Sequence, residues 1–416
     1  MAKTDFTTST DYEHPYRPLP IRVFNSIGKS TGLSGPLDVE GLLGTARRKT
    51  GLSNFGDNGH LQALKVLVKS VNEEAGLTPT GRLIQKSRLT GALVQRLRIE
   101  AVLKKHPEIE DIDLGTIVLV AGLPRSGTTL LHRLLHSHPD VRGVSGVEAL
   151  EPVPAGDARR HEATARKLRA VLAKHAISYL SPQFAAVHPI DPSEPEEDVM
   201  LLDLNFMSQA PEAIMHVPSY SGWLEEQDHT QTYEHFRKVL KILCWQRPGK
   251  NWVLKTPHHM EYLDVFLKVF PDATVVQTHR DPRKTLPSFC SMVAHNRAIF
   301  SDRVDPREIA RHWTRKTRRM VELTMEVRAR ADPDRFVDVS YYDLTKDPFG
   351  QLRQVHRKAG IDFGDEAMQI AEKYMNRNPK NRFGKHAYQL SDFGLDEKTI
   401  EENFSSYRAK HEIPFE

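Results

Sequence analysis

The feature that most constrains the fold is an apolar run, Thr116 to Ala121 (TIVLVA), which leads into a glycine-containing loop and then a helical pattern. The run is continuous and β-branched, which is typical of a strand buried on both faces of a parallel sheet. The loop, Gly122 to Thr129 (GLPRSGTT), carries two glycines at the spacing of a phosphate-binding loop. A buried strand that turns through such a loop into a helix predicts an α/β fold.

Three more short apolar runs have the same pattern, at Trp252 to Leu254, Ala273 to Thr278 and Phe336 to Ser340. Helical patterns lie around them, at Thr129 to His136, Thr232 to Trp245, Met260 to Phe270 and Arg307 to Arg330. Strands that alternate with helices predict a P-loop-like, doubly wound parallel sheet flanked by helices.

The first 110 residues have a different, helical pattern. We predict a short helix after Asp38 that ends near Gly51, a second from His60 to Glu74, and a longer one that Thr80 caps and that ends before Pro107. The sequence thus indicates a helical N-terminal cap region, 1–110, followed by an α/β domain, 111–416, that carries the anion-binding loop.

Composition narrows the class of protein. The 416 residues are 39% hydrophobic and have a formal net charge of +4, so nothing indicates a nucleic-acid binder. The two cysteines, Cys244 and Cys290, give no disulfide framework and favour a reducing compartment. The start has no apolar leader, and the longest apolar stretch falls far short of the roughly 20 residues of a membrane-spanning helix. We therefore expect a cytoplasmic protein without a transmembrane segment.

The loop from Gly122 to Thr129 has a chemistry of its own. Its turn is expected to point the backbone N–H groups of Ser126 to Thr129 at an anion, with the helix N-terminus adding positive potential. The lysine that ends an ATP-binding P-loop is replaced by Thr128. Arg125 supplies a cation and a planar donor fork instead, which suits a shorter anionic group than a triphosphate.

The stretch PRSGTTLL resembles the 5′-phosphosulfate loop of sulfotransferases that use 3′-phosphoadenosine 5′-phosphosulfate (PAPS). The arginine in this loop is similar to that of tyrosylprotein and bacterial members of the family. The resemblance implies that PAPS is the donor, and that Arg125, Ser126, Gly127, Thr128 and Thr129 hold its phosphosulfate group.

A second anion site is expected because PAPS also carries a 3′-phosphate. Arg280 ends a predicted strand and Ser288 lies eight residues further on, so a guanidinium and a hydroxyl can converge on one phosphate. The same arginine, seven intervening residues and serine form the 3′-phosphate motif that this segment resembles.

Lys255, at the end of another predicted strand, directs an ammonium to the sheet edge where ligands of open α/β sheets bind. A fixed cation there, together with Arg125, would stabilise the charge that develops on the leaving phosphate.

The general base is left open between three residues. Glu148 is favoured, because it follows HPDVR where tyrosylprotein sulfotransferases, which this stretch resembles, have a catalytic glutamate. His259 comes next and His258 last; cytosolic relatives have Lys-Thr-His here, whereas Pro257 intervenes in this chain. A third acidic group, 196–198, is interpreted instead as a charge cluster at a helix N-terminus.

Near the end, a basic glycine-containing segment resembles the loop with which family members close over the 3′-phosphate. Arg382 and Lys385 are the expected cations of this lid.

These features together predict a PAPS-dependent sulfotransferase. It would move a sulfuryl group to a hydroxyl of a small-molecule or lipid-like acceptor and release 3′-phosphoadenosine 5′-phosphate (PAP), without a metal. A homodimer is left open. One alternative is a P-loop nucleoside kinase or other NTPase, for which Val337 to Val339 would supply a Walker-B-like aspartate. Another is a non-catalytic nucleotide-binding protein.

Overall fold

A computed structural model describes residues 8–12, 14–32, 35–159, 164–189, 191–378 and 386–416. It contains a five-stranded parallel sheet in the order β2-β3-β1-β4-β5. The strands are β1 (Thr116–Gly122), β2 (Val141–Arg142), β3 (Asn251–Lys255), β4 (Thr274–His279) and β5 (Phe336–Ser340). β1 is the central strand, with β3 and β2 on one side of it and β4 and β5 on the other. The carboxyl ends of β1, β3 and β4 therefore meet where open α/β sheets bind their ligands.

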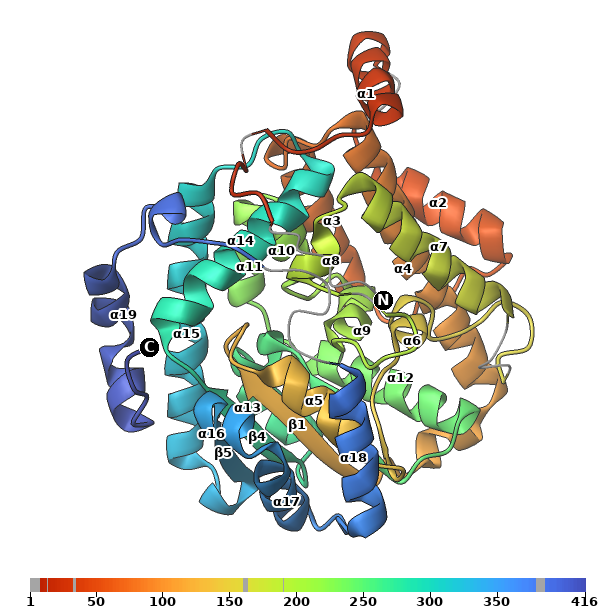
Figure 1. Cartoon of the computed structure of the whole chain (residues 1–416). Coiled ribbons are helices and arrows are strands. Elements are labelled where there is room, and N and C mark those ends of the chain that lie inside the picture. Colours follow the sequence, from red (N-terminus) through yellow and green to blue (C-terminus); the bar gives the residue numbers. More distant parts are fainter. Residues whose placement is uncertain (1–7, 13, 33–34, 160–163, 190, 379–385) are drawn as a thin grey trace.

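Helices surround the sheet on both faces (Figure 1). In chain order they are α1 (Leu19–Thr31), α2 (Val39–Thr50), α3 (Gly59–Glu73), α4 (Pro79–Lys105), α5 (Thr128–His136), α6 (Gly146–Leu150), α7 (Thr164–Leu180), α8 (Phe184–Val187), α9 (Val199–Leu202), α10 (Ala210–Ile214), α11 (Pro218–Glu225), α12 (Thr230–Gln246), α13 (Leu263–Val269), α14 (Pro282–Phe300), α15 (Pro306–Arg330), α16 (Tyr341–Lys346), α17 (Pro348–Ala359), α18 (Asp365–Arg377) and α19 (Glu397–Lys410). Short 3₁₀ turns are η1 (Pro107–Asp111), η2 (Asp203–Asn205), η3 (Pro257–Met260), η4 (Pro333–Arg335) and η5 (Ser391–Phe393). Within the described ranges, no helix combines the length and the apolar character needed to cross a bilayer.

The central strand is buried on both faces, as its apolar run predicts. Leu119 and Ala121 join the apolar cluster that packs under α12, α13, α14 and α15. Val118 and Val120 point to the other face and pack with α5 and α17. Because successive side chains of a strand alternate between faces, only a continuous apolar run satisfies both layers. The α/β prediction is confirmed.

The N-terminal helices form a third apolar cluster. Asp38 caps α2 by accepting a hydrogen bond from the N–H of Gly41 (2.6 Å), and α2 ends at Gly51 with a positive φ of 70°. The long helix α4, however, is capped by Thr78 and not by Thr80: Thr78 is extended and its Oγ1 accepts from the N–H of Gly81 (3.0 Å), while Pro79 opens the helix. The cluster also includes residues from α11 and α14, so its packing extends beyond residue 110.

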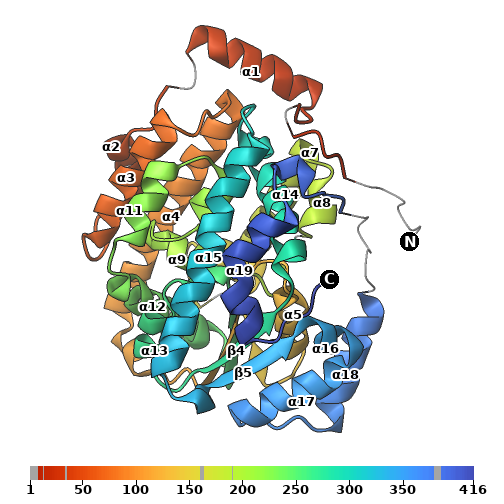
Figure 2. The same cartoon turned by 90° about the vertical axis from the view of Figure 1, so that its left-hand side faces the viewer.

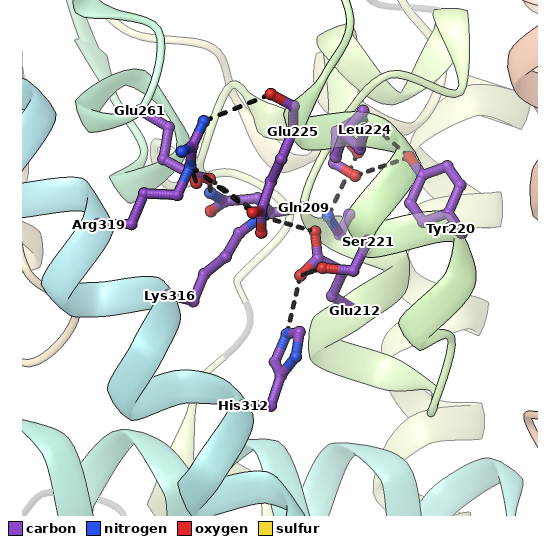
Figure 3. A network of polar contacts seen from close by, with 12 residues as sticks. Gln209, Glu212, Tyr220, Ser221, Leu224, Glu225, Glu261, His312, Lys316 and Arg319 are labelled. Carbon is purple, nitrogen blue, oxygen red and sulfur yellow. Dashed lines mark hydrogen bonds and ion pairs between the residues drawn. The ribbon is translucent and has the colours of Figure 1, made fainter.

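A buried ionic network ties α15 to α10, to α11 and to the turn that follows β3 (Figure 3). Lys316 has no exposed side-chain surface, and its ammonium contacts carboxylates of Glu212 (3.2 Å), Glu225 (2.9 Å) and Glu261 (3.2 Å). Burial alone would lower the pKa of Lys316, but these three carboxylates raise it above its usual value. Because Glu261 directly follows η3, the network fixes the turn that leaves the carboxyl end of β3.

Candidate active site

The loop between β1 and α5 has the backbone of an anion cradle. Gly122 has φ 154°, and a Cβ there would lie 2.2 Å from Oγ1 of Thr278, so only glycine fits between β1 and β4. Gly127 caps α5 with φ 93°. The first N–H groups of a helix have no intrahelical partner. Those of Gly127, Thr128 and Thr129 are therefore the donors that the loop offers to an anion.

Ser126 has a different position from the one expected. Its N–H donates to the carbonyl of Leu123 (3.2 Å), and its fully buried hydroxyl donates to the same carbonyl (2.6 Å). The hydroxyl also lies 2.6 Å from Oγ1 of Thr278. These contacts hold the loop against β4, so the buried side chain of Ser126 fixes the shape of the loop.

Arg125 joins the two predicted anion sites. It has a positive φ of 71°, and its Nε donates to the hydroxyl of Ser288 (3.1 Å). Its Nη1 donates to the carbonyl of Val187 (3.3 Å) in α8. Nη1 of Arg280 in turn donates to the carbonyl of Arg125 (3.3 Å). The loop arginine, Arg280 and Ser288 thus lie together, although up to 163 residues separate them in the sequence.

Arg280 already holds an anionic group of the same chain. Its Nε and Nη2 donate to the two carboxylate oxygens of Glu416, at 2.9 and 2.7 Å. The guanidinium also stacks over the ring of Tyr341, 3.9 Å from its centroid. The hydrogen bond from Arg280 lowers the pKa of Glu416. A carboxylate bound by two parallel N–H groups shows that the fork is oriented to take a planar or tetrahedral anion.

Lys255 lies beside the loop at the end of β3. Its side chain is 3% exposed, and its ammonium contacts Oγ1 of Thr129 (3.5 Å) and a carboxylate oxygen of Glu197 (2.7 Å). The hydroxyl of Thr256 donates to the other oxygen of Glu197 (3.2 Å). Although burial would raise it, the neighbouring ammonium lowers the pKa of Glu197. A lysine, a carboxylate and the first turn of α5 therefore share one corner of the site.

The two histidines after Lys255 face inward. The ring of His259 is fully buried, with Nε2 3.0 Å from Oδ1 of Asp198 and Nδ1 2.8 Å from the hydroxyl of Tyr233. Oδ2 of the same aspartate accepts from the backbone N–H of Lys255 (2.8 Å). His259 and Asp198 thus brace the end of β3.

His258 is also fully buried, against the rings of His229 and Tyr262, and its ring nitrogens have no hydrogen-bond partner within the described ranges. Burial lowers the pKa of His258 well below its usual value, so the ring is neutral.

Glu148 is held by structural contacts. It forms a capping box with Ser145, in which Oε2 accepts from the N–H of Ser145 (2.9 Å), and Oε1 accepts from Nη2 of Arg142 (3.0 Å). Burial raises the pKa of Glu148, but the guanidinium of Arg142 outweighs it and the net effect is a lowered pKa. A carboxylate that caps a helix and neutralises a buried arginine is poorly suited to accept a proton from a substrate.

The acidic group 196–198 makes contacts that the sequence did not predict. Asp198 does precede the short helix α9, but Glu197 and Asp198 turn toward the end of β3 and not toward the helix. The available signal was Lys255 itself: a lysine that ends a buried strand requires a carboxylate partner. An acidic group next to prolines, before a helix of only four residues, was a candidate for that partner.

The two cations expected in the lid, Arg382 and Lys385, lie outside the described residues. One group of possible metal ligands exists in the part of the chain that is described, formed by His279, Asp338 and His411. Arg328 donates to both oxygens of Asp338, at 2.6 and 2.8 Å, which satisfies that carboxylate without an ion.

Comparisons with known proteins point to one family. The profile of a family described as the sulfotransferase family matches residues 118–365. The crystal structure of sulfotransferase STF1 from Mycobacterium tuberculosis H37Rv is 33% identical, covers 90% of this chain and 100% of its own, and superposes with a TM-score of 0.79. That of STF9 from Mycobacterium avium is 27% identical, covers 91% and 97%, and has a TM-score of 0.82.

Curated relatives are also similar. The omega-hydroxy-beta-dihydromenaquinone-9 sulfotransferase Stf3 of Mycobacterium bovis is 26% identical over 265 residues, which are 59% of this chain. The chain spans 62% of the length of this relative and of its Mycobacterium tuberculosis counterpart. With a family profile over more than half of its length and a solved relative above 30% identity over nine tenths of it, the chain belongs to the sulfotransferase family of enzymes.

Proposed function

We propose that this protein transfers a sulfuryl group from PAPS to a hydroxyl of a small-molecule or lipid-like acceptor and releases PAP. The observation that carries the proposal is the contact between the two anion sites. Arg125, in the loop at α5, donates to Ser288, and Arg280 donates to the backbone of Arg125. A nucleotide with an anionic group at its 5′ end and another at its 3′ position matches this pair of sites.

The donor residues divide between the two ends of PAPS. The N–H groups at the start of α5 and the guanidinium of Arg125 would hold the phosphosulfate. Arg280 and Ser288 would hold the 3′-phosphate, with the arginine as a bidentate donor. The fit rests on the chemistry of these groups: an open row of N–H donors, and a guanidinium fork that already takes a carboxylate.

Glu197 is the general base in this proposal. It replaces Glu148 and His259, whose polar atoms make structural contacts. It also replaces His258, whose neutral ring is buried against aromatic side chains. Glu197 lies 2.7 Å from the lysine that would face the leaving phosphate, and 29% of its side chain is exposed. It accepts the proton of the acceptor hydroxyl as the hydroxyl oxygen bonds to sulfur. The bond between sulfur and the bridging oxygen breaks, and PAP leaves with the electron pair while Lys255 stabilises the new charge.

The ion pair between Glu197 and Lys255 couples these two roles. In the free protein the ammonium lowers the pKa of Glu197, whereas burial acts to raise it. When Lys255 turns to the donor, the carboxylate loses part of its counter-charge while the effect of burial remains. The pKa of Glu197 then rises, which makes it a stronger base at the stage where a proton must be removed.

This coupling has a kinetic signature. The acidic limb of kcat/KM for PAPS reports the free protein and that of kcat reports the complex. We expect the limb in kcat to lie at higher pH. Glu197→Gln should lower kcat at least about a hundredfold, the lower end of a general base's contribution, with little change in PAP affinity. Glu148→Gln is the matched variant: if it lost turnover selectively while Glu197→Gln kept it, the base assignment would be reversed.

The alternatives are weaker on specific grounds. An NTPase would need an aspartate for Mg²⁺, and the candidate Asp338 is on the edge strand β5, where Arg328 and His279 occupy its oxygens. A non-catalytic nucleotide binder would not need a lysine and a carboxylate paired beside the cradle. The curated relatives named as menaquinone sulfotransferases support a lipid-like alcohol as the acceptor class.

The proposal is tested by donor selection followed by turnover. The purified protein should be retained on immobilised 3′,5′-ADP and eluted by PAPS but not by ATP with Mg²⁺. Arg280→Ala should reduce this retention. With ³⁵S-labelled PAPS and a series of long-chain alcohols and hydroxylated quinones, labelled sulfate esters should form. Elution by ATP with Mg²⁺ alone, or retention without any transfer, would contradict it.

A further inference from the structure

Helix α7, drawn in yellow-green in Figure 1, exposes several apolar side chains to solvent. Leu168, Val171, Leu172 and Tyr179 are 55%, 38%, 57% and 52% exposed. At about 100° per residue these positions fall on one side of the helix. The buried residues Arg166, Ala170 and Leu180 fall on the opposite side. The helix therefore turns a stripe of apolar side chains to solvent, which is unusual for a surface helix.

The charges of α7 have one sign. Its sequence, TARKLRAVLAKHAISYL, contains four arginine and lysine residues and no acidic residue. Lys167 and Lys174 lie along one flank of the apolar stripe, and Arg169 lies along the other. Arg169 is 52% exposed on its side chain even though it contacts Glu151 (2.6 Å). Lysines with long apolar stems beside an apolar stripe can keep their ammonium groups at the level of phosphates while the stripe enters the acyl region.

We propose that α7 docks on the surface of an anionic lipid bilayer. Its exposed stripe would insert at the boundary between headgroups and acyl chains, and the lysines on its flank would bind lipid phosphates. A helix of 17 residues is about 25 Å long and can lie flat in this plane. A second copy of the chain is a poorer occupant, because a two-fold interface on this stripe would bring the same cations together.

Docking of α7 would bring the loop proposed to bind the donor close to a lipid-like acceptor. α7 leads into α8, and the carbonyl of Val187 at the end of α8 accepts a hydrogen bond from Arg125 (3.3 Å). Membrane-bound α7 would therefore hold the loop region close to the bilayer, where a lipid-like alcohol resides. This inference deepens the proposed function, since it names the surface from which the acceptor enters.

Helix α1 has a similar outward face. Leu19, Val23 and Ile27, spaced by four residues, are 64%, 51% and 50% exposed, whereas Asn25 and Gly28 are buried on the other side. α1 projects from one end of the molecule, and α7 lies in the same half of the molecule (Figure 2). It is a second exposed apolar face in this half of the molecule.

The test is vesicle flotation with the full chain. Phosphatidylcholine vesicles with 30% phosphatidylglycerol, a composition chosen for surface charge, should bind the protein, and pure phosphatidylcholine vesicles should bind it much less. The variant Leu168→Ser/Leu172→Ser/Tyr179→Ser should partition at least about tenfold less, and Lys174→Gln should weaken binding only to the anionic vesicles. Leu83→Ser, which changes a 48% exposed leucine of α4, is the control and should bind as the parent does.

The readouts separate this inference from the proposed function. Binding of PAP, measured by calorimetry, should be unchanged in the α7 variants, which also shows that they are folded. Equal flotation of the parent and the triple variant would overturn the docking even if sulfuryl transfer is found. So would no flotation, or a dimer in size-exclusion chromatography that the triple variant abolishes. Flotation with the expected charge dependence would support docking even if no acceptor is turned over.

Discussion

The contact between Arg280 and Glu416 leads to a quantitative prediction for donor binding. The carboxylate of Glu416 occupies the two N–H groups that the 3′-phosphate of PAP would take. The two anions cannot share one fork, so donor binding must break this ion pair. Glu416→Gln removes the charge and keeps the shape of the side chain. We therefore expect Glu416→Gln to bind PAP more tightly than the parent.

The magnitude follows from the exposure of the pair. The side chains of Arg280 and Glu416 are 16% and 30% exposed, and their contact is bidentate. A fully exposed pair contributes about 0–1 kcal/mol and a hydrogen bond to a charged group about 1.5–3 kcal/mol. About 1 kcal/mol is a reasonable value between these ranges. Because 1.4 kcal/mol corresponds to a factor of ten, the dissociation constant of PAP should fall about fivefold.

Isothermal titration calorimetry with PAP measures this change directly. Asp334→Asn is a suitable control, since it removes the same charge from a surface carboxylate that contacts Lys358 (2.8 Å) on another part of the molecule. The control should bind PAP as the parent does. If Glu416→Gln bound PAP with unchanged or lower affinity, Arg280 would not be the 3′-phosphate site, and the two-ended donor assignment would have to be abandoned.

Three other outcomes follow from the same contacts. Lys255→Ala should reduce turnover far more than PAP affinity, because the ammonium is assigned to the leaving group; equal turnover in steady-state assays would remove it from the mechanism. Lys316→Met should lower the free energy of unfolding by about 3–5 kcal/mol, the cost of leaving buried carboxylates without their cation, which urea denaturation at pH 7 can measure. Burial raises the pKa values of Glu212 and Glu225. Contacts with Lys316 and with neighbouring donors outweigh burial and lower both values from 4.5 to about 2. These depressed values stabilise the fold above pH 4.5, and that stability should be lost as the pH falls toward 2; a flat stability between pH 5 and 3 would argue against the network.

The strands of the sheet could be predicted where a short apolar run indicates a buried strand. The apolar runs that became β1, β3, β4 and β5 were found to within a residue or two at their ends. β2 was missed because it has only two residues, Val141 and Arg142, and is too short for any periodic pattern. α14 was not among the predicted helices, and Pro287 lies inside it. Proline removes a backbone donor and usually ends a helix, so the sequence pattern there was ambiguous.

The residues that the proposal places around the donor lie in short segments of the chain, whereas the proposed base and Lys255 lie far apart in the sequence. The cradle and the Arg280/Ser288 pair are short segments, each with its spacing fixed by one strand and the turn after it. The base depends on which carboxylate the fold brings to Lys255. Glu197 is 58 residues away from that lysine in the sequence. Glu148 was favoured by its place in the chain, but Arg142, six residues before it, holds its carboxylate elsewhere.

The two cations assigned to the reacting nucleotide each hold a carboxylate of the same chain in the free protein. Lys255 contacts Glu197 and Arg280 contacts Glu416, and both contacts are 2.7 Å. Burying these cations without counter-charges would be costly, so the internal carboxylates make the empty site stable. Donor binding is then an exchange of one anion for another at each end. At the Arg280 end the displaced carboxylate is only a competitor. At the Lys255 end the displaced carboxylate is the proposed base, so the step that neutralises the leaving group also frees the group that activates the acceptor.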